Sequence, residues 1–333
     1  FGNGEDIGEV SANDVDGTID SFEITGGNED VNGDGENPFA IDDSGSITVN
    51  DASDIVQAIA QENGPFNLQV EVTDNEGATS SAPANIDVEL FGEGGSVFLI
   101  DRNEDETIQG LEARFDTIRG ALKQADSYDI VAVGAGDYRE PPRSESDPDS
   151  LEVSTKGIKL IGPNAGTPGD EGRTSDEAVI KNQLVIEADE VTFDGFTLDL
   201  DDVDLTTNDR GEMLRISDGA DDVTVKNNIV EKGSGENLSG GEGLDGINVF
   251  GGSATDPVDS AVIQNNLVTN LTGDDSEIYG PSVAGISVQG NATNTNVLKN
   301  TVKDIGEGTV PWGFGIVVRG TGNHNETPSG VQV

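Results

Sequence analysis

Four side chains of this sequence stand out as candidates for catalysis. Arg215 lies in the middle of one short apolar triplet and Arg319 directly follows another, so both would face outward from the same sheet. Asp201 and Asp202 are neighbours, and paired carboxyl groups can share the acid and base roles of glycoside hydrolysis. Because the chain carries 65 Asp+Glu, such pairs also arise by chance, so they are a weak acid/base signal.

A second candidate chemistry is the binding of Ca²⁺ by oxygen side chains in a loop. Asp30, Asn32, Asp34 and Glu36 alternate along the chain, and Gly35 would let the loop turn, as in the first half of an EF-hand-type loop. The closing glutamate of such a loop is missing, and Asp42 or Asp43 would have to replace it. The alternative is an acidic hairpin tip without a metal.

A weaker set of possible Ca²⁺ ligands comes from two other turns of the same region. These residues are Asp14, Asp16, Asp74 and Glu76. Carboxylates and amides are the ligands that Ca²⁺ prefers, so we expect Ca²⁺ as a structural ion.

Four N-glycosylation sequons occur, at Asn237, Asn270, Asn291 and Asn325. All four fall in expected loops of the second half of the chain. The number is close to chance for a sequence this rich in Asn, Ser and Thr.

The charge of the chain bounds its partners and its environment. With 17 Lys+Arg against 65 Asp+Glu, the net charge is −48, which disfavours nucleic acid and anionic membrane surfaces. No apolar run approaches the roughly 20 residues of a membrane helix, and there is no cysteine. Such self-repulsion is relieved by molar salt, which is typical of proteins from extreme halophiles. Residue 1 is Phe, so we expect a removed leader or a fragment.

Residues 1–92 predict a β-sandwich, followed by a glycine-rich hinge at 93–96. Strand-like runs at 19–24, 45–49, 66–72 and 85–90 alternate with Gly-containing turns. The segments VSANDVDGTIDSFEITGGN, PFAIDDSGSITV and FNLQVEVTDNEGATSSAPANIDVEL together resemble one cadherin-like repeat. That resemblance implies an extracellular module for adhesion or spacing, with Ca²⁺ at its ends.

Residues 97–333 predict a solenoid. Apolar triplets begin at 184, 214, 247, 286 and 316, and a second set of apolar segments begins at 191, 223, 261 and 297. The spacing varies while the pattern persists, as in stacked coils. The spacing at 115–125 predicts a helix. The segments FDTIRGALKQA, DIVAVGAGDYRE and KGIKLIG closely resemble the opening of pectin-lyase-like proteins, which implies a right-handed parallel β-helix with a short N-terminal capping helix.

Three asparagines, Asn227, Asn265 and Asn300, fall at one repeat position in the second set of segments. We expect an internal asparagine ladder there. The last residues resemble the start of a further coil, so the β-helix is expected to be incomplete at its C-terminal end.

The family resemblance also raises the question of polysaccharide cleavage. Lyases of this fold use a basic residue, usually with Ca²⁺, beside a uronate carboxylate, a role open to Arg215 or Arg319. Asn248, Phe250, Ser287 and Gln289 could share that face. However, the later motifs of pectinesterases and the paired aspartates of polygalacturonases are absent from the sequence.

We therefore expect a non-enzymatic structural or adhesive protein at the cell surface of an extreme halophile, with a rigid β-helix rod and a Ca²⁺-binding spacer or assembly domain. Expected partners are copies of itself, other surface proteins or a polysaccharide. One alternative is a lyase or hydrolase of acidic polysaccharide, and another is a virus tail-spike-like fibre.

Overall fold

The computed structural model describes residues 4, 6–30, 35–51, 54–55, 66–85, 97–102, 108–140, 150–170, 173, 177–201, 211–217, 219–233, 243–252, 257–273, 283–308, 313–320 and 327–333. The chain divides into two compact units, residues 1–90 and 91–333. The hinge expected at 93–96 lies outside the described residues. No described helix is long and apolar enough to cross a membrane.

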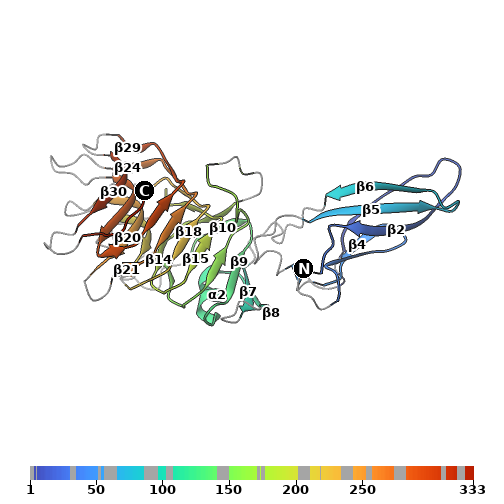
Figure 1. Cartoon of the computed structure of the whole chain (residues 1–333), viewed down its shortest axis with the longest axis horizontal. Helices are drawn as coiled ribbons and strands as arrows, with labels where there is room; N and C mark the ends of the chain where they lie inside the picture. Colours follow the sequence, from blue (N-terminus) through green and yellow to red (C-terminus); the bar gives the residue numbers. More distant parts are fainter. Residues whose placement is uncertain are drawn as a thin grey trace. The chain divides into compact units, whose positions relative to one another are not determined.

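The first unit is a β-sandwich of two antiparallel sheets (Figure 1). One sheet has the order β1-β4-β3, from Asp6–Glu9, Ser46–Val49 and Phe39–Ile41. The other has the order β2-β5-β6, from Ile19–Gly26, Asn67–Asp74 and Thr79–Asn85. The strands expected at 19–24, 45–49 and 66–72 are confirmed, and β6 was not expected. Residues 86–90 of the fourth expected strand lie outside the described part.

The core of the sandwich is built by alternating residues of these strands. Ile47 and Val49 of β4 pack with Leu68 of β5, all at most 1% exposed. Phe39 meets Phe66 edge to face, with 5.0 Å between ring centroids. Period-two alternation therefore places one side of each sheet in the core, as the sequence pattern requires.

The second unit is a right-handed parallel β-helix whose first coil is covered by a short helix. Helix α2 spans Ile118–Gln124, where the sequence predicts a helix over 115–125. The hydroxyl of Thr117 accepts the backbone N–H of Gly120 at 3.0 Å and so caps its first turn. Ile118, Ala121 and Leu122 are buried in the same core cluster as Val131 of the first coil. The capping role expected for this helix is confirmed.

Three sheets run along the β-helix, and in Figure 1 their strands follow one another in chain order from green to red. The first contains β9 (Ile130–Val133), β12 (Lys159–Ile161), β15 (Thr192–Asp194), β18 (Thr224–Lys226), β22 (Val262–Gln264) and β27 (Asn296–Leu298). It is extended by β7 (Val97–Arg102) and β8 (Ile108–Phe115), which pair antiparallel.

The second sheet contains β10 (Gly136–Tyr138), β13 (Ala178–Ile180), β16 (Thr197–Asp199), β19 (Ile229–Glu231), β23 (Leu267–Thr269) and β28 (Thr301–Val302). The third contains β11 (Ser150–Val153), β14 (Gln183–Ile186), β17 (Gly211–Ile216), β20 (Leu244–Gly251), β25 (Val283–Gly290) and β30 (Gly313–Arg319). Two short pairs complete the coils: β21 (Val258–Asp259) with β26 (Ala292–Thr293), and β24 (Leu271–Gly273) with β29 (Ile305–Gly308).

The apolar triplets form the third sheet in the register that the sequence predicts. Leu184 pairs with Leu214, and the column continues through Ile247, Ile286 and Ile316. Leu184, Leu214, Ile247 and Ile286 are fully buried. The second set of segments splits into strands of the other two sheets, such as β15 and β16. The inward side chains of successive coils therefore stack directly on one another.

The corners between the sheets are set by residues in the left-handed region. Positive φ recurs at Glu190, Asp222, Ser260 and Asn294, then five residues later at Gly195, Asn227, Asn265 and Lys299. A third column, Lys232, Asn270 and Asp304, follows after another five residues. Successive corners of a coil thus lie five residues apart and use the same backbone conformation, whatever the side chain.

The expected asparagine ladder is confirmed at Asn300, whereas in the two earlier coils its buried members lie one residue after the expected Asn227 and Asn265. Asn228, Asn266 and Asn300 form it: Asn228 and Asn266 are fully buried, and each accepts the backbone N–H of its neighbour one coil earlier, from Phe196 N and Asn228 N, at 2.9 and 3.0 Å. Asn227 and Asn265 occupy the left-handed corner, where Lys299 is their counterpart, and the expected amide bond between them is present: Asn265 Nδ2 donates to Asn227 Oδ1 at 3.2 Å. In the two earlier coils an asparagine stands at both positions, so the sequence fits a ladder at either one. In the last coil the first position is Lys299, so only Asn300 can belong to the ladder.

Candidate functional site

A cluster of polar side chains lies on the outer face of the third sheet. Register pairs Arg215 with Asn248 and Asn248 with Ser287, and pairs Phe250 with Gln289 and Gln289 with Arg319. The two arginines and the four residues expected beside them therefore share one face. The strand pattern predicts this because the residues between and after the inward positions must point outward.

Glu212 anchors one half of this cluster. Its Oε1 accepts Nδ2 of Asn248 at 2.5 Å, and its Oε2 accepts Nη1 of Arg215 at 3.2 Å. The guanidinium of Arg215 also donates to Ser217 Oγ at 3.1 Å and lies 4.6 Å from the ring centroid of Phe250. Glu212 is only 4% exposed, and its charge is compensated by the arginine of its own strand.

Asp245 anchors the other half, one coil further on. It pairs in register with Glu212, and its Oδ2 accepts Nε2 of Gln289 at 2.8 Å. Arg319 Nη2 lies 3.7 Å from the same oxygen, so the ion pair spans from β20 over β25 to β30. The other oxygen, Oδ1, is buried without a hydrogen-bond partner among the described residues.

This environment changes the acidity of Asp245. Burial raises its pKa to about 6, and the nearby charge of Glu212 acts in the same direction, against the opposing effect of Arg319. A carboxyl group with this pKa can give or take a proton near neutral pH. Asn248 and Ser287 beside it are at most 1% exposed, so water has little access to this part of the cluster, whereas the side chain of Arg319 is 43% exposed.

The aspartates expected to act with these arginines lie elsewhere. Asp201 directly follows β16 in the second sheet, and its backbone N–H donates to Asp199 Oδ1 at 3.2 Å. Asp202 lies outside the described residues. Sequence reasoning missed Glu212 and Asp245, although extending the triplet alignment three residues toward the N-terminus places both in one column.

A ladder of aspartates runs along one corner of the β-helix. Asp189 Oδ1 accepts the backbone N–H of Asp221 at 3.1 Å, and Asp221 Oδ1 accepts that of Asp259 at 2.7 Å. Asp259 Oδ1 accepts from Thr293 Oγ1 and Asn294 Nδ2, which end the ladder. Burial raises the pKa of Asp221, and the charges of Asp189, Asp259 and Asp222 add to this.

In the first unit, two proposed calcium ligands already have a structural role. Asp42 Oδ1 accepts from Ser44 Oγ at 2.6 Å and from the N–H groups of Ser44 and Ser46, and these bonds lower the pKa of Asp42. Asp74 Oδ1 accepts the N–H groups of Glu76 and Ala78 at 2.8 and 2.9 Å. Each carboxylate thus closes the turn of a hairpin.

The remaining calcium candidates are only partly brought together. Asp14 and Asp74 line one cavity of about 320 Å³ beside β2 and β5, and Asp14 accepts the N–H of Asp16 at 3.4 Å. Asp30 accepts the N–H of Gly35 at 2.8 Å, and Glu36 follows directly, whereas Asn32 and Asp34 lie outside the described residues. Within the described part of the chain, no three acidic or histidine side chains converge as a metal site would require.

Two of the four sequons can be placed, and they differ in accessibility. Asn270 is an exposed corner residue with φ 55°. Asn291 has a buried amide nitrogen, and the hydroxyl of its sequon threonine, Thr293, is bonded to Asp259. Asn237 and Asn325 lie outside the described residues.

Comparison with protein-family models, with curated proteins and with solved structures finds no match to this chain. The parallel β-helix and its polar cluster therefore have to be interpreted from their own geometry.

Proposed function

We propose that this chain is a structural or adhesive protein of an extracellular surface, with the β-helix as a rigid rod and the sandwich as a spacer or assembly domain. One observation carries this proposal: the two carboxyl groups best suited to chemistry are buried, and each is paired with an arginine. Glu212 and Asp245 are each 4% exposed, and each has an arginine as its counter-ion. A carboxyl group that acts on a polymer must come within hydrogen-bond reach of it.

The environment proposed for this protein is concentrated salt. The acidic side chains of the folded chain repel one another, both through the net charge of −48 and within the aspartate ladder. Molar salt weakens this repulsion, because it shortens the screening length to about 3 Å. From the two sequence resemblances we also propose a cadherin-like role for the first unit, structural Ca²⁺ in its turns, and a haloarchaeal origin. The pairing of Asp14 and Asp74 at one cavity supports calcium there.

The test is a joint assay of binding and cleavage in molar KCl. The protein is incubated with a panel of acidic and neutral polysaccharides, and self-association is followed by sedimentation. The proposal expects retention on a polysaccharide or concentration-dependent assembly, without new reducing ends or unsaturated products. Product release that is lost in Arg215→Ala or Glu212→Gln, but kept in Asp201→Asn, would overturn it.

A second candidate, the cleavage of a polysaccharide, is favoured by the Glu212–Asp245 pair. The two carboxyl groups occupy one register position on consecutive strands, and Asp245 has a pKa of about 6. In this alternative, protonated Asp245 would donate to the leaving oxygen and Glu212 would act as base or nucleophile. It expects activity that falls above about pH 6 and is abolished by Asp245→Asn. Full activity in that variant would reject it.

A further inference from the structure

The segment that follows β12 crosses several coils of the β-helix instead of joining the next strand directly. We define the strap as residues 162–170 together with Arg173. It starts in the coil of β12 and makes contacts in the coils of β15, β18, β22 and β27. In a simple solenoid each coil contacts only its neighbours, so this connection is a departure from the architecture.

The strap supplies a donor to one carbonyl oxygen in each of three successive corners. The acceptors are the left-handed residues of the second corner column. Asn164 N donates to Gly195 O at 3.3 Å, Arg173 Nη2 donates to Asn227 O, and Gly169 N donates to Asn265 O at 2.9 Å. A buried carbonyl without a donor destabilises the fold, so these bonds stabilise the corners that the strap covers.

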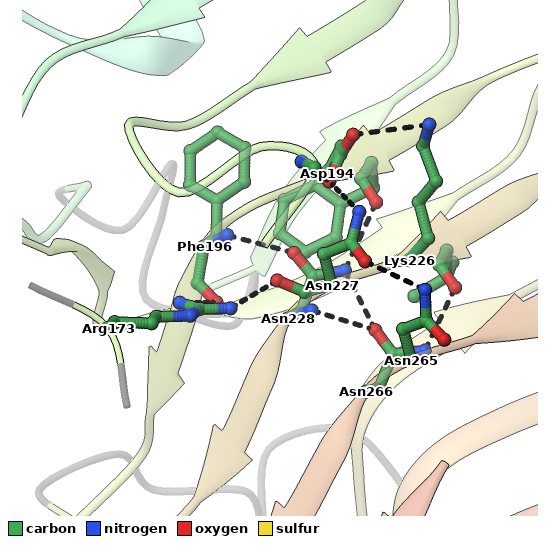
Figure 2. A network of polar contacts seen from close by, with 11 residues as sticks. Arg173, Asp194, Phe196, Lys226, Asn227, Asn228, Asn265 and Asn266 are labelled. Carbon is green, nitrogen blue, oxygen red and sulfur yellow. Dashed lines mark hydrogen bonds and ion pairs between the residues drawn. The ribbon is translucent and has the colours of Figure 1, made fainter. Parts of the chain in front are cut away.

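Arg173 is held for this role by partners on two sides. Its side chain is 4% exposed, and Nη1 lies 2.8 Å from Glu177 Oε2, which also accepts Thr197 Oγ1 at 2.9 Å. Nη1 further reaches Phe196 O at 3.4 Å. Figure 2 shows the guanidinium beside Asn227, Asn228 and Phe196, next to the asparagine ladder.

Close packing fixes the path of the strap. A Cβ on Gly169 would lie 2.4 Å from Asn228 O and 2.8 Å from Leu267 N, both backbone atoms. At the near end, a Cβ on Gly195 would lie 2.1 Å from Ala165 N. At the far end, Thr301 Oγ1 donates to Asp170 Oδ2, which joins residues 131 positions apart.

We propose that the strap is a clamp that makes the coils from β12 to β27 unfold as one cooperative unit. Without it, each coil would be stabilised by its two neighbours alone, and the distal coils could open separately. With it, the opening of a distal coil must also break that coil's bonds to a strap that is anchored in the coil of β12. The inference is independent of the proposed surface function.

The test is hydrogen exchange of the full chain in urea at fixed molar KCl, followed in peptides that contain β12, β18 and β27. In the wild type the three regions are expected to open in one transition. Gly169→Ala and Asp170→Ala are expected to speed exchange of β27 at least tenfold more than exchange of β12. Ile263→Val, which removes a buried methyl group from the coil of β22 and leaves the strap residues unchanged, is the matched control and should keep a single transition.

Several outcomes would overturn the clamp. They are separate opening of the coils in the wild type, equal changes in all three regions in both strap variants, or the same splitting in Ile263→Val. If Gly169→Ala does not fold, Asp170→Ala decides the matter, because it removes only the side-chain contact to Thr301.

Discussion

Glu212 and Asp245 occupy the same register position on consecutive strands, yet their surroundings differ. Glu212 receives hydrogen bonds on both oxygens, from Asn248 and Arg215. Asp245 has one oxygen bonded to Gln289 and one buried without a partner among the described residues. The repeat therefore places two carboxyl groups side by side and gives them unequal access to donors.

Replacement of Asp245 by Asn is expected to stabilise the β-helix at pH 7 and above. The pKa of Asp245 is raised to about 6 from 3.8, so the folded state binds a proton that the unfolded state has released. Its contribution to stability is thus highest below about pH 4 and is lost as pH rises through 6. The ionised group costs up to about 3 kcal/mol at neutral pH.

The measurement is urea unfolding of both proteins between pH 4 and 8 at fixed high salt. The difference between the two curves should grow between pH 4 and 6 and then level off. Asp201→Asn, on an exposed residue, shows the effect of removing one negative charge alone. A constant difference across this range would contradict the expectation.

The asparagine ladder predicts a sharp contrast between neighbouring residues. Asn266→Ala removes bonds to Val225 O and Asn300 Oδ1 and leaves Asn228 N without its acceptor, so we expect a loss of about 2–4 kcal/mol. Asn265→Gly keeps a residue that tolerates φ 56° and loses one partly buried bond, from Asn265 Nδ2 to Asn227 Oδ1, so its effect should stay within about 1 kcal/mol. Denaturant unfolding of both variants checks this. Equal losses of stability would show that the buried ladder asparagine contributes no more than its neighbour at the corner.

The aspartate ladder predicts a salt-dependent stabilisation. Asp221→Asn keeps an oxygen to accept Asp259 N–H and removes the central charge, so it should stabilise by about 0.5–1 kcal/mol in dilute salt. In molar salt the gain should shrink, because the repulsion is screened. The pKa of Asp221 is raised, so the stabilisation by Asp221→Asn is expected at pH values where Asp221 is ionised and is absent in acid, where Asp221 is protonated. Thermal melting across a KCl series tests this, with Asp201→Asn as the control; a gain independent of salt would count against it.

Calcium binding by the first unit predicts that a chelator lowers the melting temperature of that unit at fixed salt. Hydrogen exchange of peptides from β5 and β2 in the full chain distinguishes this unit from the β-helix. Asp14→Asn should remove the chelator effect, because it removes a proposed calcium ligand. It is the cleaner variant, since Asp14 closes no hairpin turn, whereas Asp74→Asn also weakens the β5–β6 turn. An unchanged transition on chelation would reject the metal.

The sequons predict unequal modification. In a host that glycosylates secreted proteins, Asn270 should carry a glycan because it is exposed at a corner. Asn291 should not, because its amide nitrogen is buried and Thr293 is bonded to Asp259. Peptide mass mapping after expression tests both, and full occupancy of Asn291 in folded protein would contradict the structure.

The fold is largely predictable from the sequence because inward side chains repeat coil after coil. The triplets at 184, 214, 247, 286 and 316 pair as expected, since a shift of one residue would turn their apolar side chains outward. β6 escaped prediction because its sequence, TSSAPAN, lacks apolar alternation and contains a proline, which an edge strand tolerates.

The site was less predictable, for a different physical reason. Arg215 and Arg319 follow from the strand pattern, but their partners depend on which outward residues of neighbouring coils lie opposite one another. Asp201 and Asp202 are candidates because they are neighbouring carboxyl groups, and adjacency in the chain says little about burial. Glu212 and Asp245 lie three residues before the triplet middles, where the strands become longer than the repeating core.

The corner columns have a consequence for how much the sequence can vary. At each corner the fold demands one backbone conformation, and Glu, Asp, Ser, Asn, Lys and Gly all satisfy it at equivalent places. Between corners it demands inward side chains that are apolar, apart from the buried asparagines of the ladder. Many different sequences can therefore adopt the same architecture. What related chains must keep is the spacing of the corners and their left-handed backbone conformation, more than any particular residue type.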